Sequence, residues 1–112
     1  MQIDQIADFL RGLNTLQTIQ AARQELAEIL ANNSDPRREQ DTRLQTAFDE
    51  TQDGIDVLTQ GNLFPTAKNH LISARNFISQ AQATEPSQRR PLIQQAIAAL
   101  NAAQNAVATI SP

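Results

Sequence analysis

The sequence has no cysteine, tryptophan or tyrosine, and it has only three glycines. Without cysteine, the chain cannot form disulfide bonds, thiolate nucleophiles or cysteine-ligated metal centres. Its aromatic residues are four phenylalanines, so the residues that favour strands are scarce. Alanine (17) and glutamine (15) dominate instead, and this composition favours helix.

Positive charge is also scarce, because nine Lys and Arg stand against 12 Asp and Glu. The net charge of −3 leaves no basic surplus to neutralise a phosphate backbone, which argues against a nucleic-acid partner. No apolar run approaches the ~20 residues of a membrane span, and the first residues lack the pattern of a signal peptide. We therefore expect a soluble, intracellular protein, and 112 residues predict a single domain over 1–112.

Apolar residues at three- and four-residue steps predict a first helix that ends near Leu30. Its inward stripe is Leu16, Ile19, Ala22, Leu26, Ile29 and Leu30. Upstream, Ile3, Ile6, Leu10 and Leu13 form a second stripe, and the two stripes meet out of phase around Gly12. Two interpretations follow: one continuous helix, or a helix broken near Gly12 and restarted by a capping box at Asn14 and Gln17.

The segment 32–36 predicts the start of a second helix, with Asp35 as N-cap and Pro36 at the first helical position. This helix is expected to run to about Gln60, with Gly61 as its stop. Its inward residues are Leu44, Ala47, Phe48, Thr51, Ile55 and Leu58.

A third helix is expected to start near Asn62 with Pro65 in its first turn, and to end before 84–87. Its seam alternates large and small side chains at Phe64, Ala67, Leu71, Ala74, Ile78 and Ala81. The last helix is expected to begin between Ser87 and Pro91, with Ile93, Ala96, Ile97, Leu100, Ala103, Val107 and Ile110 inward. Short connections force antiparallel neighbours, so the sequence predicts an all-α, up-down-up-down four-helix bundle.

Candidate catalytic and metal-binding residues are few. His70 is the single histidine, and it lies at the margin of the third helix's seam. Asp49, Asp53 and Asp56 share one helical flank and form the candidate cation site. The segment is a poor match to a calcium loop, because Thr51 and Gln60 occupy positions where acidic ligands belong. We expect a solvated acidic face there, and no enzyme, metal or cofactor.

Two arginine pairs, Arg37–Arg38 and Arg89–Arg90, stand where the second and fourth helices begin. Helix dipoles disfavour cations at these positions, and the predicted topology brings both pairs to one end of the bundle. One hypothesis is that they bind an acidic protein partner or the acidic end of another copy. The alternative is pairing within the chain, with Glu39, Asp41 and Glu85.

The leading functional hypothesis is a non-catalytic helical bundle that acts through protein–protein contacts. Such a protein is a structural subunit of a larger assembly, for example a virion or another lattice, or an adaptor. Its partner-binding candidates are Arg37, Arg38, Arg89 and Arg90. The alternative is a small bundle that binds a ligand or metal through the carboxylate cluster between Asp49 and Asp56.

Overall fold

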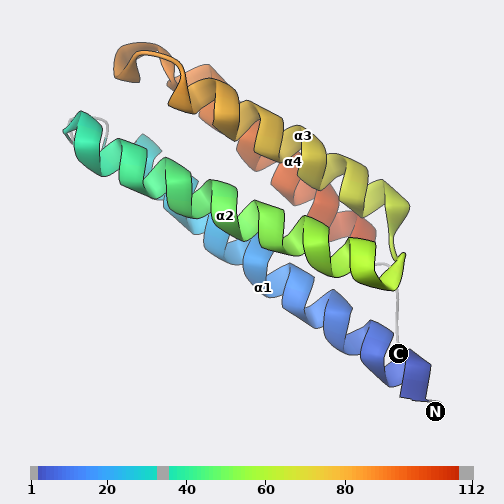
Figure 1. Cartoon of the computed structure of the whole chain (residues 1–112). Helices are drawn as coiled ribbons and strands as arrows, with labels where there is room; N and C mark the ends of the chain where they lie inside the picture. The colour runs from blue at the N-terminus through green and yellow to red at the C-terminus, as the bar shows by residue number, and fades with distance from the viewer. Residues whose placement is uncertain (1–2, 33–35, 109–112) are drawn as a thin grey trace.

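The computed structural model describes residues 3–32 and 36–108. Helices dominate this part of the chain, and no strand occurs in it. The elements are α1 (Ile3–Ala31), α2 (Arg37–Gly61), α3 (Pro65–Gln82), the short 3-10 turn η1 (Pro86–Gln88) and α4 (Arg90–Ala108). Each helix packs on the next one along the chain, and α4 packs back on α1, which closes an elongated rod of 50 × 19 × 19 Å (Figure 1). The predicted antiparallel four-helix bundle is confirmed.

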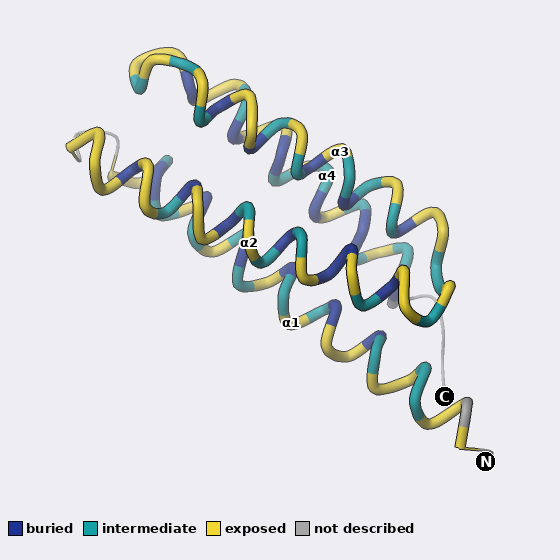
Figure 2. The backbone as a smooth tube through the Cα atoms, viewed as in Figure 1, coloured by how far each residue is buried: buried dark blue, intermediate teal, exposed yellow. Residues whose placement is uncertain are grey.

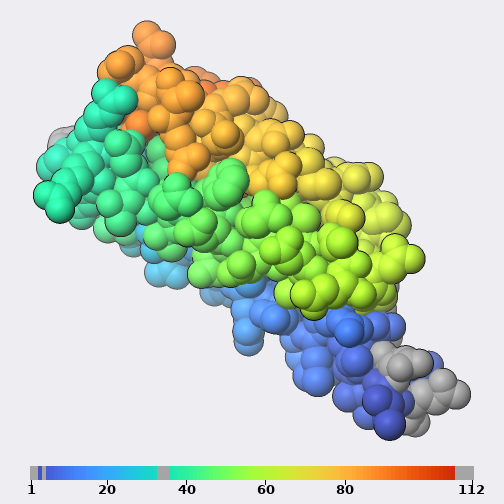
Figure 3. Space-filling view, in the orientation of Figure 1, coloured from blue at the N-terminus to red at the C-terminus, as the bar shows by residue number. Residues whose placement is uncertain are grey.

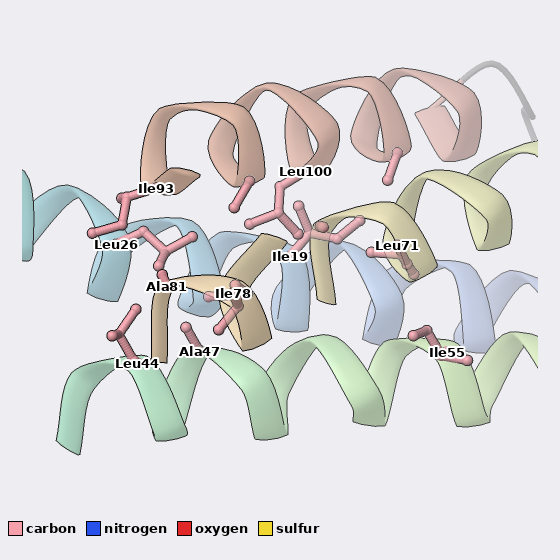
Figure 4. Close-up of a cluster of buried hydrophobic side chains, with 14 of the residues drawn as sticks. Ile19, Leu26, Leu44, Ala47, Ile55, Leu71, Ile78, Ala81, Ile93 and Leu100 are labelled. Carbon is pink, nitrogen blue, oxygen red and sulfur yellow. The ribbon is translucent and has the colours of Figure 1, made fainter. Parts of the chain in front are cut away.

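One hydrophobic core joins all four helices, and every one of its buried members belongs to a predicted inward stripe (Figures 2 and 4). Five other predicted inward residues are only partly buried against this core: Leu16, Leu30, Phe48, Phe64 and Ile97. The seam of α3 illustrates it, because Ala67, Leu71, Ala74, Ile78 and Ala81 are all completely buried. Small side chains between large ones let neighbouring helices approach closely, and each fully buried Leu or Ile contributes about 1.5–3 kcal/mol. The predicted inward residue Ile110 lies outside the described residues.

The break near Gly12 does not occur, because α1 is continuous from Ile3 to Ala31. Gly12 is buried, and a Cβ placed there would lie 3.7 Å from the Phe64 ring and 3.8 Å from Val107. The end of the four-helix core therefore lies at the level of Gly12. Asn14 and Gln17 lie inside the helix, so the capping-box interpretation was wrong.

The second helix also ends differently from the prediction. Gly61 is its last residue, and Asn62 adopts the left-handed conformation, with φ 51° and ψ 46°. The Leu63 amide donates to the Leu58 carbonyl at 3.0 Å and the Asn62 amide to the Thr59 carbonyl at 3.2 Å, which is a Schellman ending. Asparagine tolerates left-handed dihedrals, so it takes the place predicted for glycine.

The starts of α2 and α3 shift by one and three residues from those predicted, to Arg37 and Pro65. Pro36 directly precedes α2 with φ −56° and ψ 149°, and the predicted N-cap Asp35 lies outside the described residues. Before α3, Phe64 is left-handed with φ 47°, so helix begins only at Pro65. The observed start of α4 at Arg90 lies within the predicted interval.

Candidate functional site

Both arginine pairs lie at the end of the bundle where α2 begins and α3 turns into α4 (Figure 1). Arg37 Nη1 lies 3.5 Å from Glu85 Oε2, and Arg37 Nε lies 3.8 Å from Asp41 Oδ2. These contacts join the start of α2 to the turn after α3. The predicted convergence of the pairs at one end is therefore observed.

Arg89 is buried inside this end, with 1% of its surface exposed. Its Nε donates to the carbonyls of Ala81 (2.8 Å) and Thr84 (2.9 Å), and its Nη2 donates to Asp41 Oδ1 at 2.6 Å. Its Nη1 donates to Gln40 Oε1 at 3.4 Å. The guanidinium thus binds carbonyls at the carboxyl end of α3, which a helix cannot satisfy internally and where the dipole favours a cation.

This burial corrects the expectation that Arg89 meets a partner, because its donors are engaged within the chain. For Arg37 and Arg89, the alternative of internal pairing describes the structure. Arg38 and Arg90 differ: both are exposed, and neither forms an ion pair with any described residue. The docking hypothesis is thereby reduced to two of its four residues.

Shallow hollows flank the two exposed arginines. Arg90 lines one of about 500 Å³, together with Ile29, Leu30, Pro86 and Ile93. Arg38 lines another of about 480 Å³, on the other side of α2's first turns. The Arg90 hollow has apolar wall residues beside the guanidinium, an arrangement that suits a side chain bearing a carboxylate. The Arg38 hollow is lined by Glu25 and Glu39 as well as by Arg38 and Arg43, so its charge is mixed.

The carboxylate cluster lies on the exposed face of α2. Asp49 Oδ1 accepts a hydrogen bond from Gln45 Nε2 at 2.9 Å, and Asp56 Oδ1 accepts one from Gln52 Nε2 at 3.0 Å. Within residues 3–32 and 36–108, no three His, Asp or Glu side chains are placed so that they could hold a metal. The metal-binding alternative through Asp49, Asp53 and Asp56 therefore has no coordinating group.

His70 is half-buried on α3. No hydrogen bond or ion pair connects it with another side chain in the described part of the chain. A general base must be within hydrogen-bonding reach of the group it serves. The structure brings no nucleophile or acid to His70 within the residues that it describes.

The most unusual surface lies elsewhere, on the first turns of α1. The exposed large apolar side chains are Ile3 (83%), Ile6 (43%), Phe9 (39%), Leu10 (56%) and Leu13 (41%). We call these five residues the α1 stripe. Contiguous exposed apolar patches are uncommon on monomeric proteins and mark interaction sites. From the sequence, the spacing of Ile3, Ile6, Leu10 and Leu13 predicted only a helix, and neither these four residues nor Phe9 was predicted to form a site.

The α1 stripe faces away from the bundle. At about 100° per residue, its positions lie roughly 160° around the helix from the positions that face the core. Gly12, Thr15 and Ile19 define the core-facing side, and all three are buried. The apolar stripe before Gly12 is therefore out of phase with the stripe after it because it faces outward on an unbroken helix. The sequence already contains this phase difference.

Part of the stripe also lies beyond the end of the core. A Cβ on Gly61, the last residue of α2, would come within 2.9 Å of the Arg11 side chain, so residues 3–10 extend past the end of α2. Figure 3 shows this part of α1 protruding from one end of the molecule.

Comparison with known proteins gives no match: no family model, no curated protein and no solved structure is significantly similar to this chain. None of the described helices combines the length and the apolar character needed to cross a bilayer. A function must therefore be inferred from the surfaces of the chain itself.

Proposed function

We propose that this protein is a non-catalytic helical bundle that acts through protein–protein contacts. It serves as a structural subunit of a larger assembly, such as a virion or another lattice, or as an adaptor, inside the cell or in a particle assembled there. The α1 stripe is the observation that carries the proposal. Its five apolar side chains are 39–83% exposed, whereas Thr15 and Ile19 on the opposite face of α1 are buried.

A chemical role has less support. The residues in the described part of the chain offer no group of metal ligands, and the single histidine has no catalytic partner there. The surface instead offers two kinds of contact: an apolar stripe at one end and, at the other, two exposed arginines that form no ion pair with the described residues. A rod with a different binding surface at each end suits a protein that links neighbours.

The proposal is tested by capture of partners from the source cells with tagged protein. The double variant Ile6→Glu and Leu10→Glu is expected to lose the proteins that the wild-type chain retains, because two carboxylates would have to be buried unpaired in the contact. Gln24→Glu is the matched control, since Gln24 is exposed on the same outer side of α1 but outside the stripe. Equal capture by wild type, double variant and control would refute the proposal.

The arginine end provides a second, independent prediction. Arg38→Glu with Arg90→Glu is expected to abolish binding of a partner whose contact side chains are acidic, because attraction becomes like-charge repulsion. Raised salt is expected to weaken the same wild-type contact, since both arginines are exposed. The measurement is retention of each captured protein at low and high salt. Retention by the reversed variant equal to that of wild type would rule out docking at this end.

A further inference from the structure

We infer that the α1 stripe binds the α1 stripe of a second copy of this chain, with the two helices antiparallel. This inference rests on the proposed function, because it names the partner of the surface that carries that proposal. Four features of α1 support it: the spacing of the stripe, its lack of charge, its length and its direction.

The spacing suits a helical partner. Ile3, Ile6, Leu10 and Leu13 follow one another at steps of three, four and three residues, the a and d positions of a coiled-coil seam. This order reads the same in both directions about residue 8. When two copies pair antiparallel with their residues 8 level, Ile3 lies opposite Leu13 of the other copy and Ile6 opposite Leu10. A two-fold axis thus makes the surface complementary to itself.

The charges permit identical helices to pair. The positions that flank the seam hold Ala7 and Asn14 on one side and Phe9 and Leu16 on the other, so no like charges meet. The charged residues Asp8 and Arg11 occupy the bundle-facing side of the helix, where they form an ion pair with each other at 3.1 Å. A seam without charge has no preference for an oppositely charged partner, whereas charged flanks would have repelled a second copy.

The length of the stripe distinguishes antiparallel from parallel pairing. Beyond Leu13, the outward positions of α1 are Gln17, Gln20 and Gln24, all of them exposed. In the antiparallel pair, Leu13 faces Ile3 of the other copy, so the partner helix ends where the glutamines begin. A parallel pair would press glutamine against glutamine along the rest of α1. The apolar stretch therefore matches the antiparallel overlap.

The direction of the stripe leaves room for the second copy. Because the stripe faces away from the bundle, the two bundles lie on opposite sides of the joint. A seam of 11 residues is about 16 Å long, well below standard interfaces, so we expect reversible association in the micromolar range or weaker.

The test is sedimentation equilibrium of purified protein over a wide concentration range. Wild type is expected to change from monomer to dimer, and Ile6→Glu alone and Leu10→Lys alone are each expected to weaken the dimer at least tenfold. An equimolar mixture of the two is expected to recover association, because Glu at 6 then faces Lys at 10 across one half of the joint. In a parallel pair these positions never face each other, so no recovery would follow.

The matched control replaces Leu10→Lys with Leu10→Glu, which places a like charge opposite Glu at 6 and is expected to give no recovery with Ile6→Glu. Helicity and melting of dilute single variants are expected to match wild type, because Ile6 and Leu10 are outside the core. A monomer at every concentration, or equal recovery with Leu10→Glu, would overturn the antiparallel dimer. The capture experiment decides the proposed function separately, since stripe-dependent capture by a monomeric chain would leave it intact.

Discussion

Arg89→Met is expected to lower the free energy of unfolding by about 3 kcal/mol. An effect this large is unusual for arginine, which most often lies on the surface. The replacement keeps much of the side chain's length and volume but removes every donor. The carbonyls of Ala81 and Thr84 then lose their guanidinium, and Asp41 loses a contact of 2.6 Å. Hydrogen bonds to charged groups contribute about 1.5–3 kcal/mol, and Asp41 regains part of this from water because it is half-exposed.

The adjacent arginine provides the control for this prediction. Arg90 is exposed and forms no ion pair with the described residues, so Arg90→Met is expected to change stability by less than about 0.5 kcal/mol. Urea denaturation followed by circular dichroism measures the free energy of unfolding of both variants. A shifted midpoint with an unchanged dependence on urea concentration identifies a change in stability. Similar losses for the two variants would show that Arg89 does not hold the α3–α4 turn to α2.

Gly54→Leu is expected to destabilise the protein by about 3 kcal/mol through overpacking. Gly54 is buried on α2, where α1 and α3 come close. A Cβ there would lie 2.9 Å from Thr18 Oγ1 and 3.3 Å from Leu71 Cδ1, so larger side chains have no space. Thr18 cannot turn away freely, because its hydroxyl donates to the Thr15 carbonyl at 2.9 Å.

Two further variants separate crowding from helix propensity. Gly12→Ala is expected to stabilise the protein by about 0.5–1 kcal/mol, because its Cβ meets only ordinary contacts of 3.7 and 3.8 Å and alanine favours helix. The double variant Gly54→Ala with Thr18→Ala is expected to lose about 1 kcal/mol less unfolding free energy than the two single variants lose when their effects are added. Thermal and urea unfolding measure these differences. Equal effects of Gly12→Ala and Gly54→Ala would contradict the packing derived from the structure.

The inward stripes were predictable because burial of an apolar face is a periodic requirement, and periodicity is local in sequence. Leu71 and Ile78 could be assigned to the core from their spacing alone. The exact ends of the helices were less predictable. For α2, both Gly61 and Asn62 can adopt the left-handed conformation that ends a helix, and the structure places it at Asn62. With the helix ending at Gly61, Leu63 and Phe64 pack against the end of the core.

Arg89 could not be assigned from the sequence. Its partner Asp41 is 48 residues away, and the carbonyls of Ala81 and Thr84 attract a cation only once α3 has ended beside α4. Four arginines with the same apparent position at helix starts therefore divide into two groups. Arg37 and Arg89 form ion pairs between the start of α2 and the α3–α4 turn, whereas Arg38 and Arg90 are exposed and form no ion pair with the described residues.

The order of residues alone determined that this protein is helical, that its helices are antiparallel and which side chains form the core. These properties depend on steps of three and four and on short connections, which act over a few residues. The tertiary structure decided which charges are buried, that α1 is unbroken, and that the apolar side chains before Gly12 remain in water. Those outcomes depend on where distant helices end relative to one another. The phase difference around Gly12 is a local signal, but it fitted a broken helix as well as an outward-facing stripe, and only the tertiary structure distinguishes the two.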